Sequence, residues 1–250
     1  PVWASRSTRK NSWTTHTSRL NRVDYGLTDL IYENPLATPS DIEGFRLEGD
    51  AAISFPQNRM RMENLRDPSE GQKANFVHWC PEDLPADISV SWDFYPIREP
   101  GLCILFFAAT GIHGEDLFDP RLAERTGEYK TYHHGEINAF HISYFRRQHP
   151  RERAFQTCNL RKSYGFHMVA QGADPLPSVA DAVPPYHCQL VKCGPEIAFV
   201  INDLQVLKWT DDGETCGPFL HGGKIGFRQM APLIAEYANL QVHGVEKRGE

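Results

Sequence analysis

The residues best suited to chemistry lie between positions 132 and 171, where histidine, arginine and amide side chains recur at every second position. The stretch reads as three consecutive strands, and alternate side chains of a strand point to the same face. In each strand one face is mainly apolar and the other mainly polar. The three polar faces carry His141 and Ser143, then Thr157, Asn159 and Arg161, and then His167, Val169 and Gln171. We predict that these faces form the floor of a polar cleft, because an ordinary solvent-facing side would hold mostly Lys, Glu and Thr.

Side chains of these types suit β-elimination from a glycan that contains uronic acid. A polysaccharide lyase removes the C5 proton beside the uronate carboxylate and expels the 4-linked sugar. It therefore needs groups that neutralise the carboxylate, and a general base and acid. His141 and His167 are the candidate bases, and Tyr132 is the candidate acid because Tyr144 falls on the apolar side of its strand. The candidate substrate-binding residues are Ser143, Arg147, Asn159, Arg161, Gln171, Arg228 and Glu136.

Two other classes of protein would also use a polar cleft. A retaining glycoside hydrolase needs two carboxyl groups that flank the scissile bond, and no string of the form E-x-D-x-E supplies them. Glu115 and Asp116 are neighbours, so on a regular strand they would point apart. A non-catalytic carbohydrate-binding protein needs neither acid nor base. The hydrolase and the binding protein are the alternatives to the lyase.

The sequence predicts no required cofactor. His133, His134 and Glu136 have the composition of a metal site, but adjacent histidines on a strand point to opposite sides, so we predict no transition metal. The acidic loops at 115–116 and 211–214 offer the oxygen ligands of a structural calcium ion. The six cysteines form no CxxC pair, and a chain of 250 residues does not need a disulfide framework.

Composition limits the partners. The formal charge of -6 is mild and the basic residues are not gathered into one patch, so we expect no binding to nucleic acid. No apolar run approaches the length of a membrane span. We expect an oligo- or polysaccharide partner, and the sandwich edges and a basic N-terminal arm leave a homodimer open. Without a secretory signal in this chain, a cytoplasmic location is favoured.

The cleft residues must be positioned by strands, and strands account for most of the chain. About a dozen short runs have strand character, turn signals recur between them, and helical periodicity is almost absent. This spacing predicts a sandwich or barrel. Residues 111–129 are predicted to form a long ordered loop with one helical turn near 120–123. Residues 1–28 are assigned to an N-terminal arm and 29–250 to a single all-β domain.

Several blocks of the sequence resemble known proteins. The hairpin IAFVINDLQVLKW and the tail GKIGFRQMAPLIAEYANLQVHGV are similar to the closing strands of concanavalin A-like jelly rolls. The blocks GEDLFDP, INAFHISYFRR, FQTCNLRKSYGFHMVAQGADPLP and GFRQMAP together resemble the YesU-like family, a domain-of-unknown-function family within the concanavalin A-like lectin and glucanase superfamily. The resemblance covers residues 29–245. It implies a β-jelly-roll sandwich of two antiparallel sheets, a carbohydrate cleft on the concave sheet, and a link to the degradation of pectic or other uronate polysaccharides.

Overall fold

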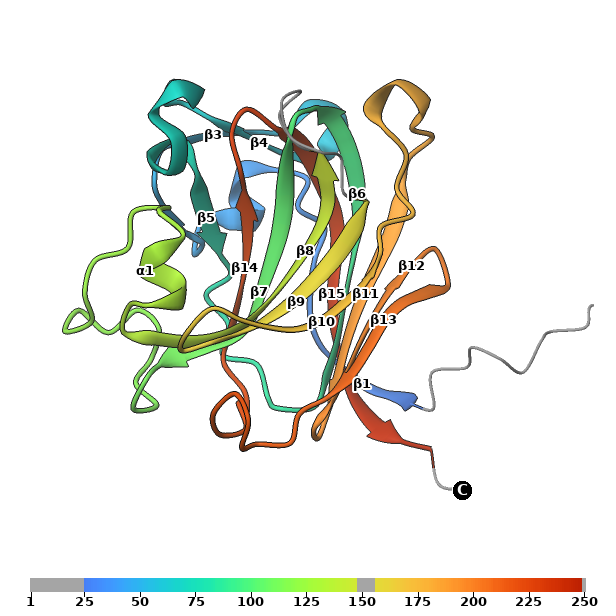
Figure 1. Ribbon diagram of the computed structural model, residues 1–250. Helices are drawn as coiled ribbons and strands as arrows, with labels where there is room; N and C mark the ends of the chain where they lie inside the picture. The colour runs from blue at the N-terminus through green and yellow to red at the C-terminus, as the bar shows by residue number, and fades with distance from the viewer. Residues whose placement is uncertain (1–24, 148–155, 249–250) are drawn as a thin grey trace, which may run out of the picture.

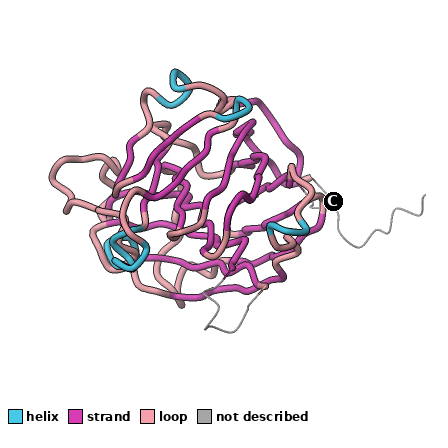
Figure 2. Tube along the Cα trace, turned by 90° about the horizontal axis from the view of Figure 1, so that it is seen from above, coloured by secondary structure: helices cyan, strands magenta, loops and turns pink. Residues whose placement is uncertain are grey.

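Strands with one apolar face need two sheets that bury these faces against each other. The computed structural model describes residues 25–147 and 156–248, and within them two antiparallel sheets pack face to face (Figure 1). Seen from above, the strands curve around a common interior, and short helices and loops lie at the periphery (Figure 2). The prediction of an all-β sandwich of two antiparallel sheets is confirmed.

Sheet A contains eight strands in the order β13-β12-β11-β6-β15-β4-β3, with β1 also paired to β15. Its strands are β1 (Tyr25–Asn34), β3 (Ala51–Ser54), β4 (Met60–Asn64), β6 (Ile88–Arg98), β11 (Tyr186–Cys193), β12 (Glu196–Ile201), β13 (Leu204–Thr210) and β15 (Ile234–Lys247). Most of the predicted arm 1–28 lies outside the described residues, and β1 begins at Tyr25, inside the predicted arm.

Sheet B contains seven strands in the order β10-β9-β8-β7-β14-β5-β2. Its strands are β2 (Arg46–Glu48), β5 (Phe76–Trp79), β7 (Gly101–Gly111), β8 (Ile137–Arg147), β9 (Thr157–Ser163), β10 (His167–Ala173) and β14 (Lys224–Gln229). The three strands expected between positions 132 and 171 are β8, β9 and β10. They lie side by side at one end of sheet B.

Helices are short in the described part of the chain, and none there is long and apolar enough to cross a membrane. They are the 3-10 helices η1 (Pro39–Ile42), η2 (Pro56–Asn58), η3 (Pro68–Ala74) and η4 (Val179–Asp181) and the α-helix α1 (Lys130–His133). The helical turn expected near 120–123 is a simple turn, in which Leu122 N–H donates to Asp119 C=O. The Asp119 side chain accepts from Arg121 N–H, and such local bonds compete with helix formation.

The main core fills the space between the sheets and is centred on Trp92 of β6. The Trp92 ring centroid lies 5.7 Å from that of Tyr144, 6.1 Å from Phe199 and 5.8 Å from Phe227. Tilted and edge-on aromatic pairs of this kind stabilise a core beyond the area that they bury. Trp92 therefore lies at the centre of the main core.

A second, smaller core lies on the outer face of sheet B. Trp79 and Phe106 point away from the main core and pack against Tyr132 of α1, with ring centroids 6.3 Å and 5.3 Å from that of Tyr132. The segment 112–136, which joins β7 to β8, covers this cluster (Figure 1). The second core therefore fixes the segment 112–136 on the sheet and decides which part of the outer face stays open.

We expect His78 to make the fold less stable in mild acid. His78 lies on β5 with 3% exposure, its Nδ1 has no hydrogen-bond partner among the described residues, and burial lowers its pKa to about 4. The unfolded chain takes up a proton near pH 6.5 and the folded chain does not. The contribution of His78 to the unfolding free energy is therefore fully present above pH 6.5. The unfolding free energy falls by about 3 kcal/mol as the pH drops to 4.

Urea unfolding between pH 4.5 and 7.5 checks this expectation. His78→Phe keeps a ring of similar size and should flatten the dependence of the unfolding free energy on pH. The exposed His221→Phe is the matched control and should keep the wild-type profile. If the unfolding free energy of His78→Phe depended on pH as steeply as that of the wild type, other groups, such as the buried His141, would determine this dependence.

Candidate functional site

Polar side chains of sheet B form a transverse row on its outer face, which is interrupted at β7 by the apolar Ile104. The Cα register pairs Arg228 of β14 with Ile104 of β7, and Ile104 with Ser143 of β8. It continues from Ser143 to Asn159 of β9, and from Asn159 to Gln171 of β10. Directly paired residues present their side chains on the same face of a sheet. The structure thus brings together four of the predicted binding residues.

A second row lies two residues further along the strands. Phe106 of β7 is paired with His141 of β8, and His141 is paired with Arg161 of β9. Phe106 belongs to the second core, so this row also lies on the outer face of sheet B. His141 and Arg161 therefore share a face with the first row.

Tyr129, which immediately precedes α1, covers the centre of this face. Its hydroxyl lies 2.6 Å from Nδ1 of His141. Its ring lies over the guanidinium of Arg228, with Cζ 4.7 Å from the ring centroid, and meets the ring of Phe166 edge-on at 5.5 Å. Tyr129 is half-buried, whereas His141 is 1% exposed and Arg228 is 0% exposed. The deep half of the predicted cleft is therefore closed by Tyr129.

Burial keeps the pair of His141 and Tyr129 neutral at pH 7. Burial, and after it the charge of Arg161, holds the pKa of His141 well below its usual value. Burial raises the pKa of Tyr129 to about 12, although Arg228, Arg161 and Arg146 act in the opposite direction. With the imidazole proton on Nε2, the Tyr129 hydroxyl donates to Nδ1 of His141, which is then in place to accept a proton.

The open part of the face lies over β9 and β10. Arg161 places its guanidinium on the ring of Phe166, with Cζ 3.7 Å from the ring centroid, and its Nη1 donates to Phe166 C=O at 3.1 Å. Phe166 is 43% exposed. Gln171 is exposed, and its side-chain amide lies 2.8 Å from the side-chain amide of Asn159. We call Asn159, Arg161, Phe166 and Gln171 the β9–β10 surface. It combines an aromatic ring, a cation and two amides.

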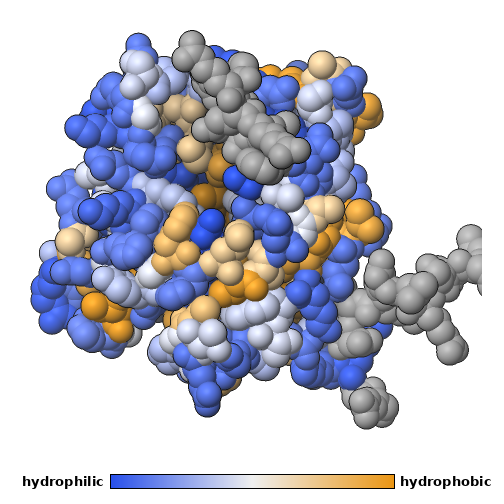
Figure 3. Space-filling model, in the orientation of Figure 1, coloured by the Kyte–Doolittle hydropathy of each residue, from blue (hydrophilic) through white to orange (hydrophobic). Residues whose placement is uncertain are grey.

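The charge on this part of sheet B is positive. The strands β8, β9 and β10 contain no Asp or Glu at any position. Arg146 adds a second guanidinium, and its Nη1 donates to Thr157 Oγ1 at 3.1 Å. On the face of the molecule seen in Figure 3, hydrophilic and hydrophobic side chains are mixed around a central hollow. A negatively charged ligand is the natural match for the β9–β10 surface.

Tyr132, the predicted acid, is not on this surface. It is 0% exposed, and its hydroxyl accepts a hydrogen bond from Gly127 N–H at 3.0 Å. The alternation rule of strands does not apply to it because it lies in α1. Its place in the second core makes it a structural residue, and Tyr129 supplies the hydroxyl that reaches His141.

The second predicted base, His167, points to the opposite side of sheet B. The register pairs it with Lys162, whose side chain is turned away from the outer face toward the Asp211 carboxylate, 2.7 Å away. A bulge between Met168 and Ala170 adds one residue to β10, so His167 and Gln171 no longer share a face. His167 lines a separate hollow of about 240 Å³.

Arg147 also departs from its predicted position. A bulge at Phe145, whose φ is +47°, ends the regular alternation of β8. Arg147 Nη1 donates to Asp174 Oδ2 at 3.2 Å, and Nη2 donates to Leu176 C=O. The neighbouring Arg146 takes the outward position instead. Arg147 thus stabilises the connection after β10, and Arg146 replaces it beside the β9–β10 surface.

Glu136 belongs to the long loop and not to the cleft. Its Oε2 accepts from Ala123 N–H at 2.7 Å, and its C=O accepts from Ile112 N–H at 3.1 Å. These bonds tie together three points of the segment between β7 and β8. Glu136 therefore takes part in the structure of the long loop, and its predicted role in substrate binding stays a prediction.

The acidic loops considered for calcium make bonds within the protein. Asp211 pairs with Lys162 as described above, and Asp116 pairs with Lys224 Nζ at 3.0 Å. Asp212 accepts hydrogen bonds from two backbone N–H groups of its own turn. Among the described residues, no group of three or more His, Cys, Asp or Glu side chains could hold a metal ion. A structural calcium ion stays a prediction.

Three residues of the candidate site were not among the predicted ones: Tyr129, Arg146 and Phe166. Tyr129 was assigned to a loop, although its spacing of three from Tyr132 is the spacing of a helical turn. Phe166 precedes β10, so the alternation of that strand does not place it, and it stacks with Arg161. No Gly or Pro marks the bulge that turns Arg146 outward.

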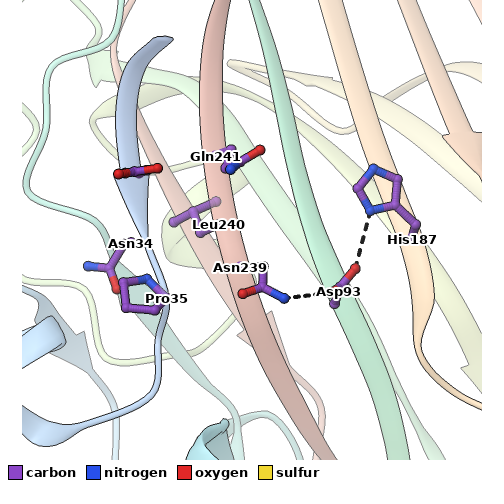
Figure 4. Close-up of a pocket in the computed structure, with 8 residues that line it drawn as sticks. Asn34, Pro35, Asp93, His187, Asn239, Leu240 and Gln241 are labelled. Atoms are coloured by element: carbon purple, nitrogen blue, oxygen red, sulfur yellow. Dashed lines mark hydrogen bonds and ion pairs between the residues drawn. The ribbon is translucent and has the colours of Figure 1, made fainter.

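A different hollow, of about 530 Å³, lies on the outer face of sheet A (Figure 4). His187 Nδ1 is 3.2 Å from Asp93 Oδ1, and Asn239 Nδ2 donates to Asp93 Oδ2 at 2.7 Å. Its lining residues include a second carboxylate, Glu33, but no Lys or Arg, and none of the predicted site residues. The hollow is thus opposite in charge to the β9–β10 surface.

The fold and the site define the class of the protein as a jelly-roll sandwich with a polar, basic strip on the outer face of one sheet. A crystal structure from Bacillus subtilis, of a protein of unknown function with a galectin-like fold, matches with a TM-score of 0.86 at 54% identity. The match covers 90% of this chain and 100% of that chain. The carbohydrate-binding module CBM66 from Bacillus subtilis matches with a TM-score of 0.50 at 12% identity, over 81% of this chain and 97% of the module. That second likeness concerns the fold alone.

The chain belongs to the family described as domain of unknown function DUF1961, whose model matches residues 29–242. The uncharacterized protein YesU of Bacillus subtilis (strain 168) is 55% identical over 218 residues, which is 87% of this chain and 97% of YesU. The predicted membership of the YesU-like family is confirmed.

Proposed function

We propose that this protein binds an acidic saccharide, one that contains uronic acid, on the β9–β10 surface. The observation that carries the proposal is Arg161, which lies on the exposed Phe166 ring and beside the Asn159 and Gln171 amides, on strands without any carboxylate. A guanidinium binds a carboxylate with charge-assisted hydrogen bonds. Amides donate to and accept from sugar hydroxyls, and an exposed ring offers apolar contact to a sugar ring.

The fold supports a saccharide ligand but does not indicate whether that saccharide is acidic. The galectin-like fold of the 54% identical structure and the likeness to a carbohydrate-binding module agree with such a ligand. Fold alone does not establish function. The basic character of the β9–β10 surface, in contrast to the acidic hollow of sheet A, supports the acidic class of saccharide.

A glycoside hydrolase is less well supported. Its two carboxyl groups must lie roughly 5 to 10 Å apart across the scissile bond. The strands β8, β9 and β10 offer no carboxylate, and Glu136 is engaged in the long loop. The β9–β10 surface therefore lacks the groups that hydrolysis needs.

Isothermal titration calorimetry tests the proposal. The titrants are oligosaccharides prepared from pectin, from alginate and from glucuronan, each as the free acid and as the methyl ester. We expect a free acid to bind, its ester to bind more weakly, and the affinity for the acid to fall with added salt. Equal affinity for acid and ester would contradict an acidic ligand, and binding to none of the six would contradict the proposed function.

β-Elimination is the second candidate function, and the contact between Tyr129 and His141 favours it. In this reaction Tyr129 Oη takes the C5 proton of the uronate while its own proton passes to His141 Nδ1, 2.6 Å away. The electron pair of the C5–H bond forms the C4–C5 double bond, and the C4–O4 bond breaks. The leaving oxygen takes a proton from Tyr129, and His141 returns the proton that it holds. One proton has then moved from C5 to O4, with no oxidant or reductant needed.

Tyr129→Phe separates elimination from binding. General acid–base groups typically contribute 10² to 10⁴ in rate, so the variant should lose elimination by at least about a hundredfold and still bind the saccharide. The ultraviolet absorbance of the unsaturated product measures the rate, and the exposed Tyr164→Phe is the control. Full turnover by Tyr129→Phe would exclude this mechanism, and an inactive wild type that binds would leave binding as the function.

A further inference from the structure

Arg228 is a buried cation without a counter-ion in the described residues. It is 0% exposed, and its Nη2 donates to Gln72 Oε1 at 3.1 Å and to Gly127 C=O at 3.2 Å. Its Nε and Nη1 have no hydrogen-bond partner there. The groups that act on its charge are the phenols of Tyr129 and Tyr132, and no carboxylate is among them.

Most other buried cations among the described residues have a carboxylate partner; the exception is Lys192, whose Nζ donates to Ala86 C=O. Arg125 pairs with the Glu48 carboxylate at 2.7 Å, and Lys162 pairs with Asp211 at 2.7 Å. Buried charges in proteins are almost always paired, because an unpaired one carries the full cost of leaving water. A buried polar group that stays unsatisfied calls for an explanation, and a ligand is one.

Two side chains that reach the protein surface cover the guanidinium of Arg228. The half-buried Tyr129 lies over its guanidinium, and the exposed Gln72 accepts its hydrogen bond. Both residues belong to connecting segments rather than to strands of the sheet. Gln72 also accepts from Tyr129 N–H at 3.3 Å, so the two form one cover.

We infer that Arg228 is a deep subsite for a carboxylate, and that the ring of Tyr129 occupies this subsite until a ligand carboxylate displaces it. The inference rests on the proposed binding of an acidic saccharide, since the carboxylate is that of a uronosyl residue bound at the β9–β10 surface. It is separate from the elimination, in which Tyr129 keeps its contact with His141. The displaced Tyr129 ring leaves the guanidinium, and the carboxylate accepts a hydrogen bond from Nη1 or Nε. In the first row, Ile104 and Ser143 lie between Arg228 and Asn159 of the β9–β10 surface.

Arg228→Met tests the inference, with Arg161→Met as the reference variant on the open surface. Urea unfolding gives the midpoint, and calorimetry with tetragalacturonate and its methyl ester gives the affinity. We expect Arg228→Met to keep or raise the unfolding midpoint, because an unpaired buried charge is removed. We expect its affinity for tetragalacturonate to fall at least tenfold, with the affinity for the ester unchanged. A lowered midpoint with wild-type affinity would show a structural cation and overturn the inference.

Hydrogen exchange gives a second, independent measurement. On binding tetragalacturonate, residues 126–134 should lose protection in the wild type and keep it in Arg228→Met. Unchanged protection in a wild type that binds would overturn the displacement of Tyr129 while leaving the proposed function intact.

A wild type that binds none of the acidic oligosaccharides would instead contradict the proposed function, and free D-galacturonate and malonate then test the subsite. Thermal stabilisation of the wild type, but not of Arg228→Met, by these carboxylates supports the subsite. Stabilisation of neither protein overturns it.

Discussion

Arg161→Met is expected to weaken the binding of an acidic oligosaccharide by roughly tenfold to a hundredfold, because it removes a charged donor that a ligand carboxylate contacts. Methionine keeps an apolar stem over Phe166, so the stacking surface is largely preserved. The melting temperature should change little, because Arg161 is only half-buried and pairs with no described carboxylate. Calorimetry at two salt concentrations measures the effect, and the salt dependence of the affinity should also decrease.

Arg98→Met is the matched control for this variant. Arg98 is an exposed arginine on β6 of the other sheet, so the replacement changes the net charge equally. It should leave the affinity within about twofold of the wild type, as expected for a screened charge far from the ligand. Similar losses in both variants would show that the overall charge, and not the β9–β10 surface, governs binding.

Glu48→Gln is expected to lower the unfolding free energy by about 3 to 5 kcal/mol, the usual cost of breaking a buried ion pair. Glu48 is 4% exposed and accepts from Trp79 Nε1 at 2.9 Å and from Arg125 Nη2 at 2.7 Å. The amide cannot neutralise Arg125, which is itself 8% exposed. Urea unfolding measures the loss. Because this pair holds the segment 112–136 on sheet B, residues 126–134 should also exchange amide hydrogens faster.

Glu43→Gln serves as the control, since Glu43 is exposed and lies shortly before β2. Surface changes of this kind usually stay within about 0.5 kcal/mol. If Glu48→Gln were no less stable than Glu43→Gln, the segment 112–136 would be held by its apolar contacts alone.

The sandwich could be predicted because its strands follow the alternation rule. The alternation is regular from His141 to Ser143 in β8 and from Asn159 to Arg161 in β9. These four residues were therefore correctly placed on one face. Short runs, frequent turns and the lack of helical periodicity sufficed for the fold class. The resemblance to a known family added the jelly-roll topology, in which strands distant in sequence such as β7 and β14 become neighbours.

The rest of the site depends on features with no pattern in the sequence. One-residue bulges at Phe145 and in β10 reverse the faces of Arg147 and His167, and a single extra residue leaves no trace in composition. The position of Tyr129 over the site depends on tertiary packing. Tyr129 closes over His141 because the second core fixes a connecting segment on the sheet, and such packing is set by residues far apart in the chain.

The most direct test of the central claim is a titration of isotope-labelled protein with tetragalacturonate, followed by amide chemical shifts. If the β9–β10 surface is the ligand site, the chemical-shift changes should be concentrated in residues 157–173 and around Tyr129. The amides of His187 and Asn239, in the hollow of sheet A, should be unaffected. Shifts confined to that hollow, or a ligand that perturbs no residue of β9 or β10, would contradict it.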